Sequence, residues 1–409
     1  MGLVRSRRLA SGDLASAIDR VVADGNCAGC GLCALLSGDV KMQLNSQGFL
    51  RPALRPSADR SPLSDAEFVA ACPGVQVSSP KRNPGADSNA ILGRALGAWQ
   101  AWACDEEIRF AGSSGGVLTA LASWMVESDQ DGPVIGAQSD LDQPTRTASV
   151  AIESRGQALR SAGSRYAPVA TLAFPGAAKS RALIVKPCEA SALRALTDRR
   201  AEDAPLLLSF FCAGTPSQTS TDGLLRMLGL RTEDVTTLRY RGNGWPGRFT
   251  ASDGVTHVSE SYEAAWGKWL GRDLQDRCKI CVDGTGEHAD ISVGDYWKSD
   301  PYGYPEFSEA PGVSAVIART PRGLEVIRRA VQEGVIGATP ISLNSIARVQ
   351  PLQKQRRRTL LARVAGRLAR GRRVPRYIGY PLWRGLVADP ARSATAFLGS
   401  IRRSGGRPT

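Results

Sequence analysis

The chain has 409 residues, of which 42% are hydrophobic and 22% are charged. This composition excludes an intrinsically disordered chain, and the length favours two or three domains. Only two histidines are present, which argues against a histidine-rich zinc, copper or non-haem iron centre. The nine cysteines are therefore the residues on which metal chemistry depends.

The positive charge is concentrated at the end of the chain. The net charge is +13, and residues 351–409 contain fifteen basic residues and one acidic residue. The first 350 residues are thus nearly neutral, so the composition does not favour a nucleic-acid partner. No apolar run of signal-peptide length follows the first arginines, and the longest apolar stretch, 115–126, is shorter than the ~20 residues of a membrane-spanning helix. We therefore expect a cytoplasmic protein with reduced cysteines.

Three segments follow one another along the chain. Residues 1–85 hold a cysteine cluster and Pro- and Ser-rich loops, and end in a linker rich in Pro, Gly and Ser at 78–85. Residues 86–345 alternate short apolar strands (133–137, 182–185, 206–211) with helical stretches (189–196, 219–228), a pattern that predicts an α/β body with βαβ packing. Residues 346–409 form a basic tail. We predict domain boundaries at 1–85, 86–345 and 346–409.

The first cysteine set has the spacing of a ferredoxin-type iron–sulfur site. Cys27, Cys30 and Cys33 form C-x2-C-x2-C, and Cys72 is followed at once by Pro73. This is the ligand pattern of a 4Fe-4S cluster, and the intervening glycines allow tight turns. Zinc is the alternative, although its ligands usually come in pairs, and inert thiols are a second one.

The second cysteine set is dispersed. Cys278 and Cys281 form a C-x2-C pair, whereas Cys188 and Cys212 each come directly after a predicted strand. Because the carboxyl ends of parallel strands line the ligand crevice, these four thiols are predicted to meet in a second site. The alternative is a group of buried core cysteines. Cys104 is left over.

A loop of small residues precedes the apolar helix predicted over 117–126. It reads Ser113-Ser114-Gly115-Gly116, and Thr119 lies in the first turn of the helix. Exposed N–H groups and hydroxyls at such a helix start suit a phosphate or pyrophosphate, whereas an ordinary N-capped helix is the alternative. Two more polar segments, 163–166 and 289–297, fit either a site edge or simple turns.

Taken together, these motifs resemble the coenzyme F-420 hydrogenase/dehydrogenase beta-subunit family, which includes 7-hydroxymethyl chlorophyll a reductase. The matching segments occur in order over residues 25–300: the first cysteine set, the loop 113–116, 186–188, 192–194, 211–217, 239–247, 277–283 and 289–295. The resemblance implies a ferredoxin-like iron–sulfur segment on an α/β flavin-binding body, with FAD and two 4Fe-4S clusters. It implies an oxidoreductase that passes electrons between the clusters and a two-electron acceptor, with ferredoxin or coenzyme F-420 as partner.

The resemblance also implies roles for individual residues. Two groups of thiolates would hold the outer cluster (Cys27, Cys30, Cys33 and Cys72) and the inner cluster (Cys188, Cys212, Cys278 and Cys281). The FAD phosphates would be held by Ser113, Ser114, Gly115, Gly116, Thr119, Ser164 and Arg165. Lys186, Tyr166 and Asp295 would lie near the flavin ring or the substrate. Family members that have Lys-Pro-Cys where this chain has residues 186–188, and that also have a basic tail, resemble those found among surface-polysaccharide genes. A non-catalytic electron-transfer subunit and a zinc-stabilised scaffold are the competing interpretations.

The tail contains a predicted basic amphipathic helix, clearest over 359–370. One face carries Leu360, Leu361, Val364 and Leu368, and the other carries Arg356, Arg363, Arg367 and Arg370. Such a helix suits either an anionic membrane surface or an acidic partner. Binding to a membrane surface would place the protein at the inner face of the membrane. A solvated arginine-rich tail is the alternative.

Overall fold

The computed structural model describes residues 13–55, 65–81, 84–128, 132–306 and 308–404. The body is built around an eight-stranded mixed sheet, whose order is β16-β6-β15-β14-β10-β9-β7-β8. Its strands are β6 (Gly97–Ala103), β7 (Val134–Ser139), β8 (Thr147–Ile152), β9 (Ala182–Val185), β10 (Leu206–Phe210), β14 (Ile291–Asp295), β15 (Ser314–Ala318) and β16 (Ile336–Pro340). The central strands β7, β9, β10 and β14 are parallel, and the outer pairings are antiparallel. The predicted α/β body is therefore confirmed as a mixed sheet.

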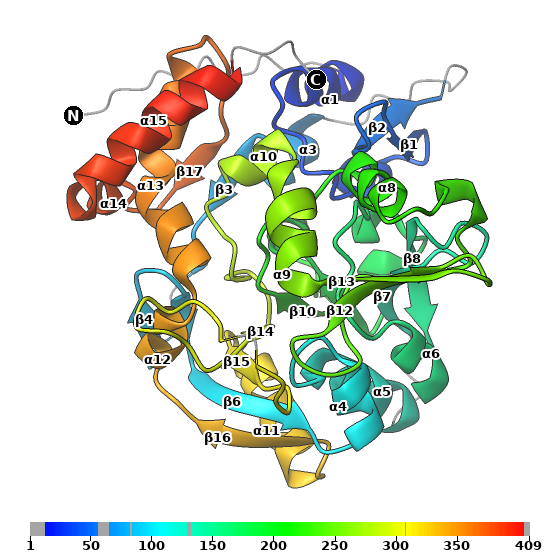
Figure 1. Ribbon diagram of the computed structural model, residues 1–409. Coiled ribbons are helices and arrows are strands. Elements are labelled where there is room, and N and C mark those ends of the chain that lie inside the picture. The colour runs from blue at the N-terminus through cyan, green and yellow to red at the C-terminus, as the bar shows by residue number, and fades with distance from the viewer. Residues whose placement is uncertain (1–12, 56–64, 82–83, 129–131, 307, 405–409) are drawn as a thin grey trace.

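Helices cover both faces of this sheet because consecutive strand residues point to opposite sides. Val134 packs into one core and Ile135 into the other. The first face is covered by α4 (Glu106–Ala111), α5 (Val117–Ser128), α6 (Arg155–Arg160) and α11 (Pro321–Gln332). The second face is covered by α1 (Leu14–Ala23), α2 (Leu32–Leu36), α3 (Asp65–Ala71), α7 (Pro187–Arg200) and α12 (Leu343–Arg348). In Figure 1, α1 and α3 lie near the top, and α5, α6 and α11 near the bottom.

The N-terminal segment shares its core with the body. Phe68 and Cys72 pack in the same cluster as Leu183 and Leu193. A hairpin of β1 (Val40–Leu44) and β2 (Leu50–Leu54) and the short strand β3 (Gln76–Ser78) complete this segment, and β4 (Asp87–Asn89) pairs with β5 (Gly93–Ala95). The predicted boundary at residue 85 therefore divides the sequence, but side chains from the two sides of it pack in one hydrophobic core.

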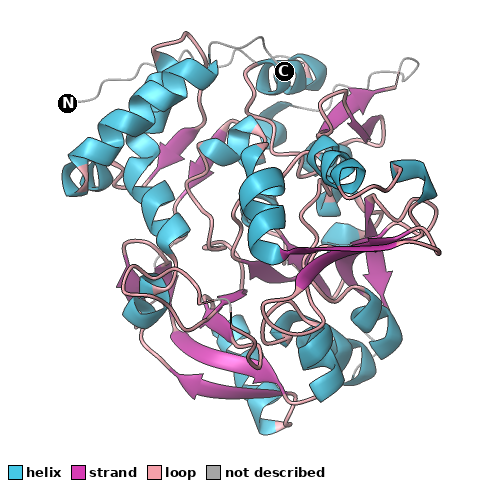
Figure 2. Cartoon of the chain, in the orientation of Figure 1, coloured by secondary structure: helices cyan, strands magenta, loops and turns pink. Residues whose placement is uncertain are grey.

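A second sheet of three strands lies beside the first. It contains β11 (Thr237–Arg239), β12 (Arg248–Ser252) and β13 (His257–Ser261), and Figure 2 shows it as a ribbon that runs to the right-hand side of the molecule. It packs with α8 (Gln218–Met227) and the short helices at 262–272, including α9 (Tyr262–Ala264), around Tyr240 and Phe249.

The basic tail is folded onto the body. It contains α13 (Pro351–Leu368), β17 (Arg376–Ile378), α14 (Trp383–Ala388) and α15 (Pro390–Ser404). β17 pairs in parallel with β3, while Leu360 and Val364 are buried with Val77, Ile280 and Val282. The predicted helix is confirmed and is longer than expected. Leu360 and Val364 of its apolar face are buried in the protein, as is Arg367 of its basic face, whereas Leu368 of the apolar face is exposed. In the part of the chain that the structure describes, no helix is both long and apolar enough to span a bilayer.

Candidate functional site

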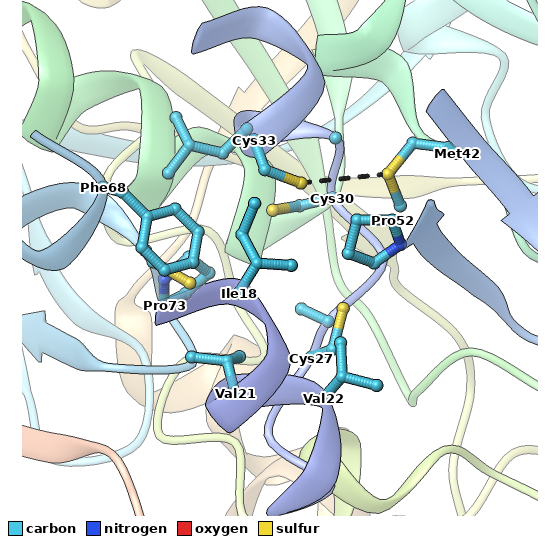
Figure 3. A pocket seen from close by; sticks show the side chains of 14 residues that line it. Ile18, Val21, Val22, Cys27, Cys30, Cys33, Met42, Pro52, Phe68 and Pro73 are labelled. Carbon is cyan, nitrogen blue, oxygen red and sulfur yellow. Dashed lines mark hydrogen bonds between the residues drawn. The ribbon is translucent and has the colours of Figure 1, made fainter. Parts of the chain in front are cut away.

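The first cysteine set surrounds one cavity. Cys27, Cys30, Cys33 and Cys72 all line it, together with apolar side chains that include Ile18 and Phe68. Figure 3 shows Cys27, Cys30 and Cys33 around this space, between α1 and the β1–β2 hairpin. The spacing in the sequence therefore translates into four thiols around one apolar cavity.

Two glycines allow the chain to wrap this cavity. Gly29 and Gly31 have positive φ angles of 63° and 85°, which disfavour any side chain. A Cβ on Gly31 would lie 2.6 Å from the backbone nitrogen of Ala173. The Gly29 N–H donates to Cys27 Sγ over 3.4 Å. Such N–H to sulfur bonds stabilise thiolates, as an iron–sulfur site requires.

The thiols of this set interact electrostatically with one another. Burial raises the pKa of Cys30 to about 12. Burial also raises the pKa of Cys33, and the neighbouring Cys27, Cys30 and Cys72 raise it further. Four thiolates this close repel one another, so a cationic group in the cavity would relieve the repulsion and favour their ionised forms.

The second set lies where parallel strands of the main sheet end. Cys188 follows β9 in the first turn of α7, and Cys212 follows β10. The C-x2-C pair comes from α10 (Asp276–Lys279) and the turn after it. Cys278 Sγ accepts hydrogen bonds from Thr215 N at 3.4 Å and from Gln275 Nε2 at 3.5 Å. The rule that carboxyl ends of strands line a crevice thus locates two of these cysteines correctly.

Electrostatic interactions connect the two sets through Cys188. Burial raises the pKa of the Cys188 thiol, and both Cys30 and Cys212 raise it further. The pKa of Cys212 is raised to about 12 by burial and by Cys278 and Cys281. Among the described residues, no three or more His, Cys, Asp or Glu side chains are close enough to hold a single metal ion. The cluster ligands therefore remain predictions, and the proximity of the thiols is what supports them.

Lys186 lies near thiols of both sets, and its side chain has two partners. Its ammonium nitrogen is 2.9 Å from the Glu189 carboxylate and also donates to the carbonyl of Val169. Burial alone lowers the pKa of Lys186, but Glu189, Cys188 and Cys30 together outweigh it and the net pKa is raised. The second Glu189 oxygen accepts from the Lys186 backbone N–H at 2.8 Å. These contacts give Lys186 a structural function at the start of α7, which carries Cys188.

The predicted phosphate loop is a tight turn before α5. Ser113 Oγ and Ser164 Oγ are 2.8 Å apart, while Ser114 Oγ donates to the carbonyl of Val313 over 2.7 Å. A Cβ on Gly115 would lie 2.5 Å from the carbonyl oxygen of Ala101, and Gly116 has a φ of 74°. The structure thus brings Ser113 and Ser164 together, as predicted for one site. Thr119 lies partly exposed in the first turn of α5.

Arg165 is used by the protein itself. Its guanidinium donates to Thr147 Oγ1 and to the carbonyls of Leu238, Pro144 and Arg146, and it lies 5.0 Å from the Tyr240 ring centroid. Few donors remain for a phosphate. Its predicted role in cofactor binding is therefore not supported by these contacts.

An arginine that the sequence did not single out is central to the site. Arg241 is 2% exposed, and its Nη1 lies 2.6 Å from Asp295 Oδ2 at the end of β14. Burial alone lowers the pKa of Arg241, but Asp295 and the nearby Tyr166 and Tyr262 outweigh it and raise the net pKa. Its Nη2 is buried without an acceptor among the described residues. A buried donor of this kind suits a ligand oxygen.

Aromatic rings surround this arginine. The guanidinium lies 4.4 Å from the centroid of Tyr262 and 4.6 Å from that of Trp245. Tyr166 packs against Tyr262 at 6.0 Å, and Trp245 stacks on Trp297 at 6.2 Å. Tyr166 and Asp295, both predicted site residues, are thus brought to the same place. The segment 239–247 is one of the family motifs in the sequence, but only the fold shows that Arg241 is buried beside Tyr166 and Asp295.

The segment of Arg241 also contacts the end of α4, directly before the phosphate loop. Gly244 N donates to the carbonyl of Phe110, and Arg239 Nη1 donates to the carbonyls of Ala111 and Ala162. The loop before α5, the segment that carries Ser164 and Tyr166, and the Arg241 group therefore form one contiguous region.

The tail closes over the second cysteine set. Arg356 of α13 donates to the carbonyls of Cys212 and Ala213, and Gln353 donates to Cys212 O over 3.1 Å. Arg363 donates to Lys279 O over 3.2 Å, between the two cysteines of the pair. Arginines of the predicted basic face thus hold the loops that carry Cys212, Cys278 and Cys281. Cys104, the ninth cysteine, is exposed.

Comparisons with known proteins assign the family. The chain matches the model for the N-terminal part of the coenzyme F420 hydrogenase/dehydrogenase beta subunit over residues 98–174. It matches the model for the C-terminal part over residues 178–343. The chain belongs to this family. The matched region includes the second cysteine set, whereas the first set and the tail lie outside it. The family resemblance is therefore confirmed, and with it the role of an electron-transferring oxidoreductase.

One solved structure is similar over much of the chain. It is described as a xenon derivative of the F420-reducing [NiFe] hydrogenase complex from Methanosarcina barkeri. The match has 21% sequence identity and a TM-score of 0.49, and covers 67% of this chain and 96% of that chain. Comparison with curated proteins found no match.

Proposed function

We propose that the protein is an FAD- and 4Fe-4S-dependent oxidoreductase. Its ferredoxin-like first segment would hold the outer cluster, and its α/β body would hold the inner cluster and the flavin. Clusters of this kind carry single electrons, and a bound flavin exchanges one or two. The observation that carries the proposal is the arrangement of the thiols: four line one cavity, and Cys188 interacts electrostatically with both sets.

The chain's own residues have distinct roles in this proposal. Cys27, Cys30, Cys33 and Cys72 bind the outer cluster in an apolar cavity, which keeps water from its ligands. Cys188, Cys212, Cys278 and Cys281 bind the inner cluster, and Lys186 with Glu189 fixes the turn between the two sets. The tail arginines hold the carbonyls behind Cys212 and thereby position this thiol.

The region around Arg241 is the proposed flavin and substrate site. Ser113 and Ser164 bring two hydroxyls together where α5 begins, which suits a pyrophosphate, whereas the Ser114 hydroxyl is used by the protein itself. Arg241, held by Asp295, offers its unpartnered Nη2 to a ligand oxygen, and Tyr166, Tyr262 and Trp245 provide flat apolar surfaces for a ring system. A hydride transfer there requires positioning more than acid–base groups, which fits the nearby arginine, aromatic and hydroxyl side chains.

The acceptor is proposed as coenzyme F-420 or an organic substrate, with ferredoxin as an electron source. The proposal also includes a role in surface-polysaccharide synthesis. This part rests on the resemblance to relatives that share the Lys-Pro-Cys sequence and the basic tail.

Anaerobic purification followed by analysis of iron, sulfide, zinc and flavin tests this function. We expect a brown protein with ~8 iron atoms and ~1 FAD per chain. About four irons would restrict the proposal to one cluster. A colourless protein that contains zinc would contradict it and favour the scaffold interpretation.

A further inference from the structure

A polar pocket lies between α10, α13 and α15, on the outer side of the C-x2-C pair. Lys279, Arg363, Arg367 and Arg403 line it, together with Asp276 and Ser400. Lys279 and Ile280 are the two residues between Cys278 and Cys281, so the pocket touches the loop of the second cysteine set.

The charge in this pocket is unbalanced. Four cationic side chains face a single carboxylate, Asp276, and that carboxylate already lies 3.0 Å from Lys279 Nζ. Arg363 and Arg367 are four residues apart on α13, a spacing at which like charges repel. Burial lowers the pKa of Arg363 to about 10, and Arg356 and Arg403 contribute to this lowering. The fold thus holds several positive charges together with little compensation.

Two donors in the pocket have no acceptor. Arg367 is 6% exposed, and its Nη1 and Nη2 donate to the carbonyls of Asp276 and Asp24. Arg363 donates through Nη1 to Lys279 O. The Nε atoms of both arginines are nevertheless buried without a partner among the described residues. Buried N–H donors are normally satisfied, so two of them beside uncompensated charge indicate a missing acceptor.

We propose that this pocket binds a phosphate-class oxyanion. Guanidinium groups bind such anions through charge-assisted hydrogen bonds, and a partly buried position strengthens them. The cations come from α10, α13 and α15, so they surround the pocket from several sides, which suits a tetrahedral anion better than a planar carboxylate. The bound anion would link the Cys278–Cys281 loop to the tail. The pocket is built mainly from residues beyond 343, where the family match ends, and it does not depend on the proposed redox function.

Calorimetric titration of the full chain with inorganic phosphate, against chloride at equal ionic strength, tests this site. Arg403 is exposed, so Arg403→Gln should fold, and loss of one charge-assisted contact is expected to weaken phosphate binding about tenfold or more. Arg363→Gln should weaken it as well. Arg402 is the matched control, because it is the exposed neighbour on α15 that does not line the pocket, and Arg402→Gln should bind like the native protein. Absence of phosphate binding, or equal affinities in Arg403→Gln and the native protein, would overturn the proposal.

A second arm distinguishes a free phosphate from a lipid headgroup. Sedimentation with phosphatidylglycerol vesicles is compared between the native protein, Arg403→Gln and Arg402→Gln, with phosphatidylcholine vesicles as the neutral reference. If Arg403→Gln weakens both phosphate and vesicle binding, the site takes a lipid headgroup. If it weakens phosphate binding alone, the site takes a soluble phosphate compound.

Discussion

The two cysteine sets differ in how the chain assembles them. Three thiols of the first set lie within seven residues, Cys27 to Cys33, and line an apolar cavity with Cys72. The second set draws Cys188, Cys212 and the 278/281 pair from distant segments, to the carboxyl ends of β9 and β10. Its surroundings are polar and basic, because Arg277 and Arg356 both interact with Cys281. A local motif thus suffices for one site, whereas the other depends on the sheet and on the tail.

The largest expected effect comes from removing a thiol of either set. Cys30→Ser and Cys281→Ser should each lose about half of the iron, since each variant removes a ligand of one four-iron cluster. Iron and sulfide analysis of the anaerobically purified variants measures this. Cys104→Ser is the control, because Cys104 is exposed and belongs to neither set. Full iron content in both Cys30→Ser and Cys281→Ser would refute the ligand assignments.

The buried ion pair between Arg241 and Asp295 should matter most for stability. In Asp295→Asn, Arg241 keeps its buried charge without a counter-charge, and the free energy of unfolding should fall by about 3–5 kcal/mol. Urea denaturation measures this change. Glu233→Gln provides the comparison, because its pair with Arg231 is exposed and should contribute little. Equal effects of the two substitutions would show that Arg241 does not rely on Asp295.

Removal of one tail contact should have a smaller effect. Arg356→Gln loses the hydrogen bonds to the carbonyls of Cys212 and Ala213, and should lower the free energy of unfolding by about 1.5–3 kcal/mol. The second cluster should also be lost first when the variant is treated with a chelator. Lys354→Gln, an exposed change on the same helix, should behave like the native protein. Selective loss of the first cluster in Arg356→Gln would contradict the proposal that α13 holds the loop that carries Cys212.

Acid should weaken the framework of the second set. Asp290 accepts from Leu207 N at the start of β10 and pairs with Arg194 of α7 and Arg322 of α11. Burial alone raises the pKa of Asp290, but the two arginines outweigh it and lower the net pKa below its ordinary value of 3.8. A lowered pKa gives stability that is present above about pH 4 and is lost as the pH falls further. Asp290→Asn should be less stable near neutral pH and should show a weaker loss below pH ~4, in unfolding experiments at a series of pH values. An unchanged pH dependence would refute this role.

The sequence predicts local features well and long-range ones poorly. Strand 182–185, the helix after Gly116 and the first cysteine set follow from short patterns, and the structure contains the strand and the helix and places the four thiols around one cavity. Arg241 could not be found from its neighbours, because its burial depends on Asp295, which lies 54 residues away.

The tail shows the same limit. The sequence shows the helical periodicity of the tail. A helical wheel, however, does not distinguish an apolar face that contacts a membrane from one that packs against the protein itself. Leu360 and Val364 pack on Ile280 and Val282, and the arginines donate to backbone carbonyls of the cysteine loops. These hydrogen bonds from tail arginines to distant carbonyl groups leave no trace in the sequence.

Electron paramagnetic resonance of the reduced protein tests the central claim most directly, namely that two clusters lie side by side. Because Cys188 of the second set lies close enough to Cys30 of the first for that thiol to raise its pKa, we predict two neighbouring reduced clusters whose signals show magnetic interaction. Cys30→Ser should leave a single signal without that interaction. A single, non-interacting cluster in the native protein, or no cluster signal at all, would contradict this arrangement.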